Sequence, residues 1–250
     1  MKETTPMDFE VKQHGRGRPE MKVSTSTKGT VTEDDVVRWE LKAARRGLMN
    51  LRTLLYGAPM TALLKAQIEE SDRRIKEYIA ASKGEVSECR TTVAVNGLKA
   101  DAFFAHMVSE SQKMSNGTPA EKSELMIKSG FVIHPEHYAL PPYPGIIETI
   151  GGLPTRMRTL PDKEPPPYVK AAYDDAYPFK FPGKAELDDG TLVAWVAHQF
   201  RNTNEGLEAV FRVWWPAACP PNYVEDHAEH FAIEFCNAFE LAAAGIAQPN

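Results

Sequence analysis

Two β-rich segments near the C-terminus, followed at once by a long amphipathic helix, constrain the fold of this chain most strongly. Residues 192–200 and 207–215 are rich in Val, Phe and Trp, and the polar stretch 202–206 between them ends in a glycine. This pattern is typical of two antiparallel strands joined by a hairpin. Apolar residues then recur at helical spacing over residues 224–244. The sequence therefore predicts an α+β fold in which an antiparallel sheet is closed by a C-terminal helix.

The first third of the chain has a helical pattern. Thr32 followed by Asp35 resembles a helix N-terminal cap, and apolar residues recur at helical spacing on both sides of a Gly/Pro break. We predict a helical hairpin over residues 33–84. Residues 1–32 are polar and have no apolar period, so we expect a flexible arm there. Residues 85–250 form the predicted α+β domain.

The middle of the chain contains further short elements. Residues 91–95, 131–133 and 146–150 are β-branched or apolar runs typical of strands, and a helical pattern opens at Gly97. Residues 161–184 hold six prolines and several aromatic side chains. A Pro-rich segment of this length indicates an ordered surface loop or a lid.

Composition argues against several classes of partner and activity. The 250-residue chain has a net charge of -5, so no global basic field would attract nucleic acid or an anionic membrane. Its three cysteines form no CxxC pair, no run of 18 apolar residues occurs, and residues 1–32 lack the apolar centre of a signal peptide. No glycine-rich nucleotide loop or Gly-x-Ser-x-Gly elbow is found. We expect a cytoplasmic protein that binds neither nucleic acid nor membrane.

The C-terminal helix carries the strongest chemical signal. His230 and Glu234 are four residues apart, so their side chains project from adjacent turns, and they flank an apolar stripe that contains Phe231 and Phe235. A carboxylate beside an apolar face needs compensation, which a metal ion provides. Two interpretations stay open from this helix alone: a pair of metal ligands, or a His–Glu pair joined by a hydrogen bond.

Further ligands would come from other parts of the chain. The candidates are His106, His134, Glu136, His137, Glu148, His198 and Glu208. Glu148 interrupts an apolar strand, and it is buried only if the face that it shares with Ile146 and Ile150 points inward. His198 shares a strand face with apolar residues and is expected to point inward, either as a core histidine or as part of a pocket.

Several segments together resemble the zinc-dependent hydrolases that cleave carbon–carbon bonds of acylated phloroglucinols and phloretin. The resemblance covers roughly residues 97–245. It is carried by Gly97-Leu98, Phe103-Phe104, His134-Pro135-Glu136-His137-Tyr138, Ala197-His198-Gln199-Phe200-Arg201-Asn202-Thr203, Gly206-x-Glu208, Trp214-Trp215-Pro216 and His230-x-x-x-Glu234.

The resemblance implies a helix-grip (Bet v 1-like) sheet curled around the C-terminal helix, and a zinc site. His230, Glu234 and Glu148 would bind the metal, with His106 as the upstream histidine and His137 as its replacement. His198 would be the acid/base of the pocket, and Trp195, Trp214 and Trp215 are candidates to line it. The expected activity is hydrolysis of a small aromatic or ketone-bearing molecule, with C–C bond cleavage of an acylated phenol as its specific form.

Two other classes of function compete with this one. A helix-grip protein can also be a non-enzymatic carrier that holds a small hydrophobic ligand between sheet and helix, in which case His230 and Glu234 would serve only as hydrogen-bonding groups. Alternatively, the helices of residues 33–84 form a dimer or partner surface of an interaction protein. A homodimer is the expected form of such an assembly, and an apolar stripe left uncovered on these helices would favour it.

Overall fold

The computed structural model describes residues 22–139, 145–162 and 164–246, which fall into two compact units. The first unit ends at Leu54, and the second begins at Leu55. In the first unit, strands β1 (Val23–Thr25) and β2 (Gly29–Val31) pair antiparallel and lead into helix α1 (Glu33–Leu54). Most of the predicted arm, residues 1–21, lies outside the described residues, while the part that is described contains this small β-ribbon.

The predicted cap of α1 is confirmed. The backbone N–H of Asp35 donates to the Thr32 hydroxyl at 3.2 Å, and the backbone N–H of Thr32 donates to the Asp35 carboxylate at 3.0 Å. Each residue thus satisfies a donor that a helix start would leave unpaired. Asp35 is buried and also forms ion pairs with Lys28, from the β1–β2 turn, and with Arg38. The cap therefore joins the ribbon to the helix.

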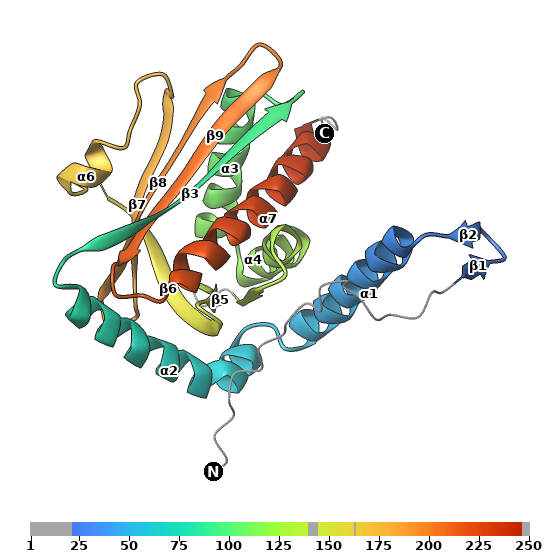
Figure 1. Cartoon of the computed structure of the whole chain (residues 1–250), viewed down its shortest axis with the longest axis horizontal. Helices are drawn as coiled ribbons and strands as arrows, with labels where there is room; N and C mark the ends of the chain where they lie inside the picture. The colour runs from blue at the N-terminus through green and yellow to red at the C-terminus, as the bar shows by residue number, and fades with distance from the viewer. Residues whose placement is uncertain (1–21, 140–144, 163, 247–250) are drawn as a thin grey trace. The chain divides into compact units, whose positions relative to one another are not determined.

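The second unit is built on a curled antiparallel sheet of seven strands in the order β3-β9-β8-β7-β6-β5-β4 (Figure 1). Every pair of neighbours is antiparallel. The strands are β3 (Val86–Asn96), β4 (His137–Ala139), β5 (Ile146–Ile150), β6 (Leu153–Pro161), β7 (Phe179–Glu186), β8 (Leu192–Asn202) and β9 (Gly206–Pro216). The long C-terminal helix α7 (Pro221–Ile246) packs against this sheet. The predicted α+β class, antiparallel sheet and C-terminal helix are confirmed.

Alternation along the β8–β9 hairpin separates two layers of packing. Phe200 and Phe211 belong to the main core, whereas Trp195 and Trp214, which are directly opposite each other in the pair, belong to a second apolar cluster. That cluster also contains Val169 from the short helix α6 (Pro167–Lys170). Of the three tryptophans that are candidates to line the pocket, Trp215 does so, whereas Trp195 and Trp214 pack in this second cluster.

Aromatic rings hold α7 against the sheet. Phe235 stacks on Phe211 of β9 with ring centroids 3.6 Å apart. Phe239 makes an edge contact at 4.6 Å with Phe103, which lies on helix α3 (Ala100–Asn116). Because Phe103 also packs on Phe200 of β8, one continuous aromatic core joins α3, α7 and the sheet.

Helix α2 (Ala58–Ser82) covers the opposite face of strand β5. Ile147 is completely buried there in a cluster with Met60, Leu64 and Ile68 of α2. Both helices predicted between residues 33 and 84 are present, but they fall in different compact units. Their association as a hairpin remains a prediction.

Two local predictions are wrong. Residues 131–133, predicted as a strand, form helix α5 (Phe131–Ile133), which follows helix α4 (Pro119–Leu125) and a π-helical segment (Met126–Gly130). A short apolar run is compatible with either a strand or a helix. In the helical conformation Phe131 is buried, with its ring centroid 6.1 Å from that of Tyr56.

The Pro-rich segment 161–184 is also more ordered than a loop, since it contains α6 and the first half of β7. Pro182 is tolerated because β6 pairs with β7 only from Gly183 onward, so the missing N–H of Pro182 removes no bond from the β6–β7 ladder. Strand β6, which was not predicted, is joined to β5 by Gly151-Gly152. Both glycines have positive φ, as a two-residue hairpin turn requires.

Candidate metal centre and pocket

The candidate site begins with two strands that place a histidine opposite a carboxylate. His137 on β4 is the direct partner of Glu148 on β5 in the antiparallel pair. Side chains of directly opposed residues lie on the same face of a sheet, close enough to interact. Both are buried, and His137 Nε2 lies 3.5 Å from Glu148 Oε2. The sequence could not decide which face of this strand points inward, and the structure places Glu148 inside, with Ile147 facing α2.

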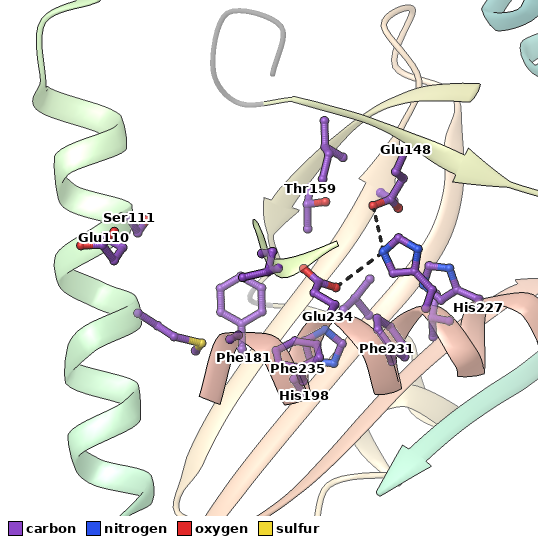
Figure 2. Close-up of a pocket in the computed structure, with 18 of the residues that line it drawn as sticks. Glu110, Ser111, Glu148, Thr159, Phe181, His198, His227, Phe231, Glu234 and Phe235 are labelled. Atoms are coloured by element: carbon purple, nitrogen blue, oxygen red, sulfur yellow. Dashed lines mark ion pairs between the residues drawn. The ribbon is translucent and has the colours of Figure 1, made fainter. Parts of the chain in front are cut away.

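Helix α7 brings two more donor groups to the same point. His230 Nε2 lies 3.5 Å from Glu148 Oε2 and 3.7 Å from Glu234 Oε2. Figure 2 shows Glu148 and Glu234 approaching one histidine from the sheet and from the helix. His137 Nε2 is 3.3 Å from His230 Nε2. Four side chains from three separate elements therefore converge.

The spacing of these donor atoms matches a small divalent cation. His137 Nε2, His230 Nε2 and Glu148 Oε2 form a nearly equilateral triangle with sides of 3.3, 3.5 and 3.5 Å. Tetrahedral ligands at about 2.0–2.1 Å from zinc are separated from one another by roughly 3.3–3.4 Å. Two imidazole nitrogens and carboxylate oxygens are also the donor types that zinc accepts. The residues present fit the metal.

A third histidine adjoins the triangle. His134, His137 and His230 are all buried, and one ring nitrogen of each lies within 4.8 Å of the others, close enough to hold a metal ion. The His134 ring stacks on the His230 ring with centroids 3.7 Å apart, and its Nδ1 accepts the backbone N–H of Glu136 at 3.1 Å. His134 thus supports the position of His230, and it is a further nitrogen donor near the same point.

The orientation of His137 is set by its second nitrogen. Its Nδ1 lies 2.9 Å from the carbonyl oxygen of Gly130 and donates its proton there, which turns Nε2 toward the cluster. Metal-binding histidines are usually held in this way. His230 lacks such a contact: its Nδ1 is buried and has no hydrogen-bond partner among the residues that the structure describes.

The electrostatics of the cluster favour a bound cation. Burial raises the pKa of the Glu234 carboxyl to about 7; His137 opposes this shift and Glu148 adds to it. Burial also lowers the pKa of His230 to about 3, against the attraction of Glu148. The two carboxylates therefore differ: although burial opposes the shift, His230 and His137 lower the pKa of Glu148, whereas the Glu234 carboxyl is poorly compensated by the protein alone. A divalent cation would supply the missing positive charge.

Three members of the cluster, Glu148, His230 and Glu234, lie in the wall of a cavity of about 420 Å³ between the sheet, α3 and α7. The lining is mostly apolar and aromatic, with Phe181, Trp215, Phe231 and Phe235 among its members. In Figure 2, Glu110 and Ser111 from α3 and Thr159 from β6 surround the same space as the two carboxylates. A cavity of this size and character suits a small aromatic molecule.

His198 points inward, as its strand face predicted, and the structure shows that it lines this pocket. Its ring stands near Phe181, Phe211, Phe231 and Phe235, with centroid distances between 5.2 and 6.3 Å. Burial lowers the pKa of His198 to about 4. The imidazole is therefore neutral near pH 7, able to accept a proton on one nitrogen and to donate a hydrogen bond from the other.

The other sequence candidates have different positions. His106 lies on α3, in the wall of the pocket. The histidine beside Glu148 and His230 is His137, so the geometry favours His137 over His106 as the upstream ligand. Glu208 is paired with Arg201 at 3.0 Å and accepts the Tyr177 hydroxyl, so it serves a separate network.

The polar residues of α3 and β6 were not predicted as pocket residues. Glu110 and Ser111 follow Phe103 and Met107 at helical spacing, so the sequence contained a sign that these residues share one face of the helix. No sequence pattern indicated that Thr159 would line the pocket.

No protein-family model matches the sequence, and no curated protein matches it significantly. Among the residues that the structure describes, no helix is both long and apolar enough to cross a membrane.

Proposed function

We propose that this chain is a metal-dependent hydrolase of the helix-grip class that acts on a small aromatic or ketone-bearing molecule. The observation that carries the proposal is the triangle of donor atoms of His137, Glu148 and His230, two of which, Glu148 and His230, line an aromatic cavity. Perturbed titratable groups gathered in a cleft are typical of active sites. The curled sheet closed by α7 supports the helix-grip class.

Zinc is the metal that these donors suit best, held by His137, Glu148, His230 and Glu234, with His134 beside them. A bound divalent ion would polarise a carbonyl oxygen and lower the pKa of a water molecule. Neutral histidine and ionised carboxylate are the protonation states that binding requires. Burial already keeps His230 neutral, whereas Glu234, whose pKa burial raises, would lose a proton when the ion binds. Although burial works against it, the pKa of His137 is raised by its hydrogen bond to Glu148 and by the charge of Glu234, so His137 would give up its second proton as well.

The remaining pocket residues have roles that follow from their chemistry. Phe181, Phe231 and Phe235 provide flat apolar surface against which an aromatic ring can stack while water is excluded. For an aryl ketone, water adds to the carbonyl carbon, the bond to the ring carbon breaks, and that carbon takes up a proton, giving an arene and a carboxylic acid. The role we assign to His198, a neutral histidine beside Phe181 in the pocket, is to accept a proton and return it to the leaving ring carbon.

The first test is the metal content of the purified chain, measured by elemental analysis beside a His230→Ala, Glu234→Ala variant. We expect about one zinc per chain in the wild type and none in the variant. A matched control is Glu225→Ala, Glu240→Ala, which removes two exposed carboxylates from the same helix. The control should retain the metal, and hydrolysis of aryl ketones would then be assayed with all three proteins. Absence of metal from the wild type would refute the metal-dependent mechanism.

A non-enzymatic carrier is the second candidate, and the apolar character of the cavity favours it. In that case the chain binds an aromatic ligand, and the His230→Ala, Glu234→Ala variant keeps most of its affinity. Titration with a fluorescent aromatic probe, in the presence of a chelator, separates the two: binding that is independent of metal, without turnover of any ketone, indicates a carrier.

A further inference from the structure

Helix α1 of the first unit exposes a row of apolar side chains at alternating spacings of four and three residues. The row consists of Val37, Leu41, Ala44, Leu48 and Leu51. Val37, Leu41 and Leu51 are 42%, 54% and 57% exposed, Ala44 is exposed, and Leu48 is half-buried. Alternating spacings of this kind define the a and d positions of a heptad repeat, the pattern that pairs one helix with another.

In this heptad frame, Leu41 and Leu48 occupy a positions, and Val37, Ala44 and Leu51 occupy d positions. The residues that flank the row carry a consistent charge pattern. Glu33 and Glu40 occupy successive g positions, while Arg38 and Arg45 occupy successive e positions. The Arg38 side chain is 71% exposed, although it also pairs with Asp35. Glu33 and Glu40 thus lie on one edge of the row, and Arg38 and Arg45 lie on the other, followed there by Arg52, which is buried.

The charges select one partner and one orientation. In a parallel pair, a g residue faces the e residue five positions later on the other helix, so Glu33 faces Arg38 and Glu40 faces Arg45, twice per dimer. In an antiparallel pair, g faces g and e faces e, which sets arginine against arginine and leaves the glutamates without an arginine partner. A second copy of this chain, aligned in parallel, is complementary to the row in both shape and charge.

We propose that α1 forms a parallel two-stranded coiled coil with α1 of a second copy, making the protein a homodimer. The interface is isologous, with the apolar row at its centre and the Glu40–Arg45 and Glu33–Arg38 pairs at its rims. This dimer surface is independent of the pocket and of its proposed activity.

The mass of the full-length protein in solution tests the proposal, by sedimentation equilibrium at micromolar concentrations. The wild type should have twice the monomer mass of 27.8 kDa. Leu41→Asp places a charge in the exposed row and should give a monomer with an unchanged circular dichroism spectrum for the rest of the fold. The matched control Val36→Asp, also at an exposed apolar residue of α1 but outside the row, should remain dimeric. A monomeric wild type, or a dimer that survives Leu41→Asp, overturns the proposal.

Charge exchange tests the partner and the rims. Glu40→Arg and Arg45→Glu should each weaken self-association at least tenfold, whereas an equimolar mixture of the two variants should dimerise again, because the mixed pair restores both contacts. Arg46→Glu, at an exposed position on the opposite side of the helix, makes the same charge change and should have no effect. If Arg46→Glu weakens the dimer as much as Arg45→Glu does, the proposed rim contact is wrong.

Orientation is tested by cross-linking. In the parallel arrangement Val37 meets its own copy at a d position, so Val37→Cys should form a disulfide-linked dimer on mild oxidation. The wild type, treated in the same way, controls for the three native cysteines. An antiparallel dimer would instead bring Val37 near Leu48. Cross-linking only between Val37→Cys and Leu48→Cys chains would reveal it and overturn the proposed orientation.

Discussion

Truncation of Phe235 should destabilise the second unit more than any surface change on the same helix. The ring is 9% exposed, stacks on Phe211 at 3.6 Å and borders Phe231 and Phe239. Replacing a buried phenylalanine by alanine costs about 3–5 kcal/mol. Because Phe235 also lines the existing cavity, its removal enlarges that space instead of opening a closed void. We therefore expect the lower end of the range, about 3 kcal/mol.

The assay is equilibrium unfolding in urea with the chelator present, so that metal binding does not contribute. Tryptophan fluorescence reports on the sheet, since Trp214 and Trp215 lie in β9. For a domain of about 200 residues, a loss of ~3 kcal/mol corresponds to a melting temperature roughly 6–12 °C lower. The matched control is Ile233→Ala on the same helix, where the side chain is 38% exposed. It should cost ~1 kcal/mol or less.

Equal losses from the two substitutions would refute the reasoning, because they would mean that the Phe211–Phe235 stack does not hold α7 to the sheet. The result matters for the site, since the same turns of α7 carry His230 and Glu234. A loosened helix would separate these groups from Glu148, and a lower metal affinity should accompany the lower stability.

Three further outcomes are expected. Chelation should lower the melting temperature of the wild type by several degrees, because a bound ligand at 100 times its Kd stabilises the folded state by about 2.7 kcal/mol and chelation removes this contribution. The melting temperature of the His230→Ala, Glu234→Ala variant should not change. Ser71→Ala should cost ~1 kcal/mol in urea unfolding, since it removes the 2.6 Å hydrogen bond with Thr155; no loss would show that the bond is dispensable. At pH 8, a thiol reagent should modify only Cys236 in the folded chain, because burial raises the pKa of Cys89 and of Cys219 to about 12, so little thiolate forms until the pH approaches that value; fast labelling of all three would contradict the burial.

Local periodicity was sufficient to predict several elements. The β8–β9 hairpin, α7 and the cap of α1 depend on residues close together in the chain, and all three are present where they were expected. The spacing of His230 and Glu234 has the same origin, since four residues on a helix place two side chains side by side whatever the rest of the protein does.

Tertiary structure decided the rest. The inward direction of Glu148, and the position of His137 opposite it, follow from the pairing of β4 with β5 and from the covering of Ile147 by α2. When both faces of a strand are buried, its sequence is apolar on both sides and does not indicate which face lines the pocket. The short apolar run 131–133 became helical for the same kind of reason, because burial against a distant element outweighed its local preference. The sequence by itself therefore determined which helices and strands form and which two α7 groups stand together. Only long-range pairing and packing decided which distant groups face them, because those contacts join segments whose spacing along the chain has no relation to their spacing in the fold.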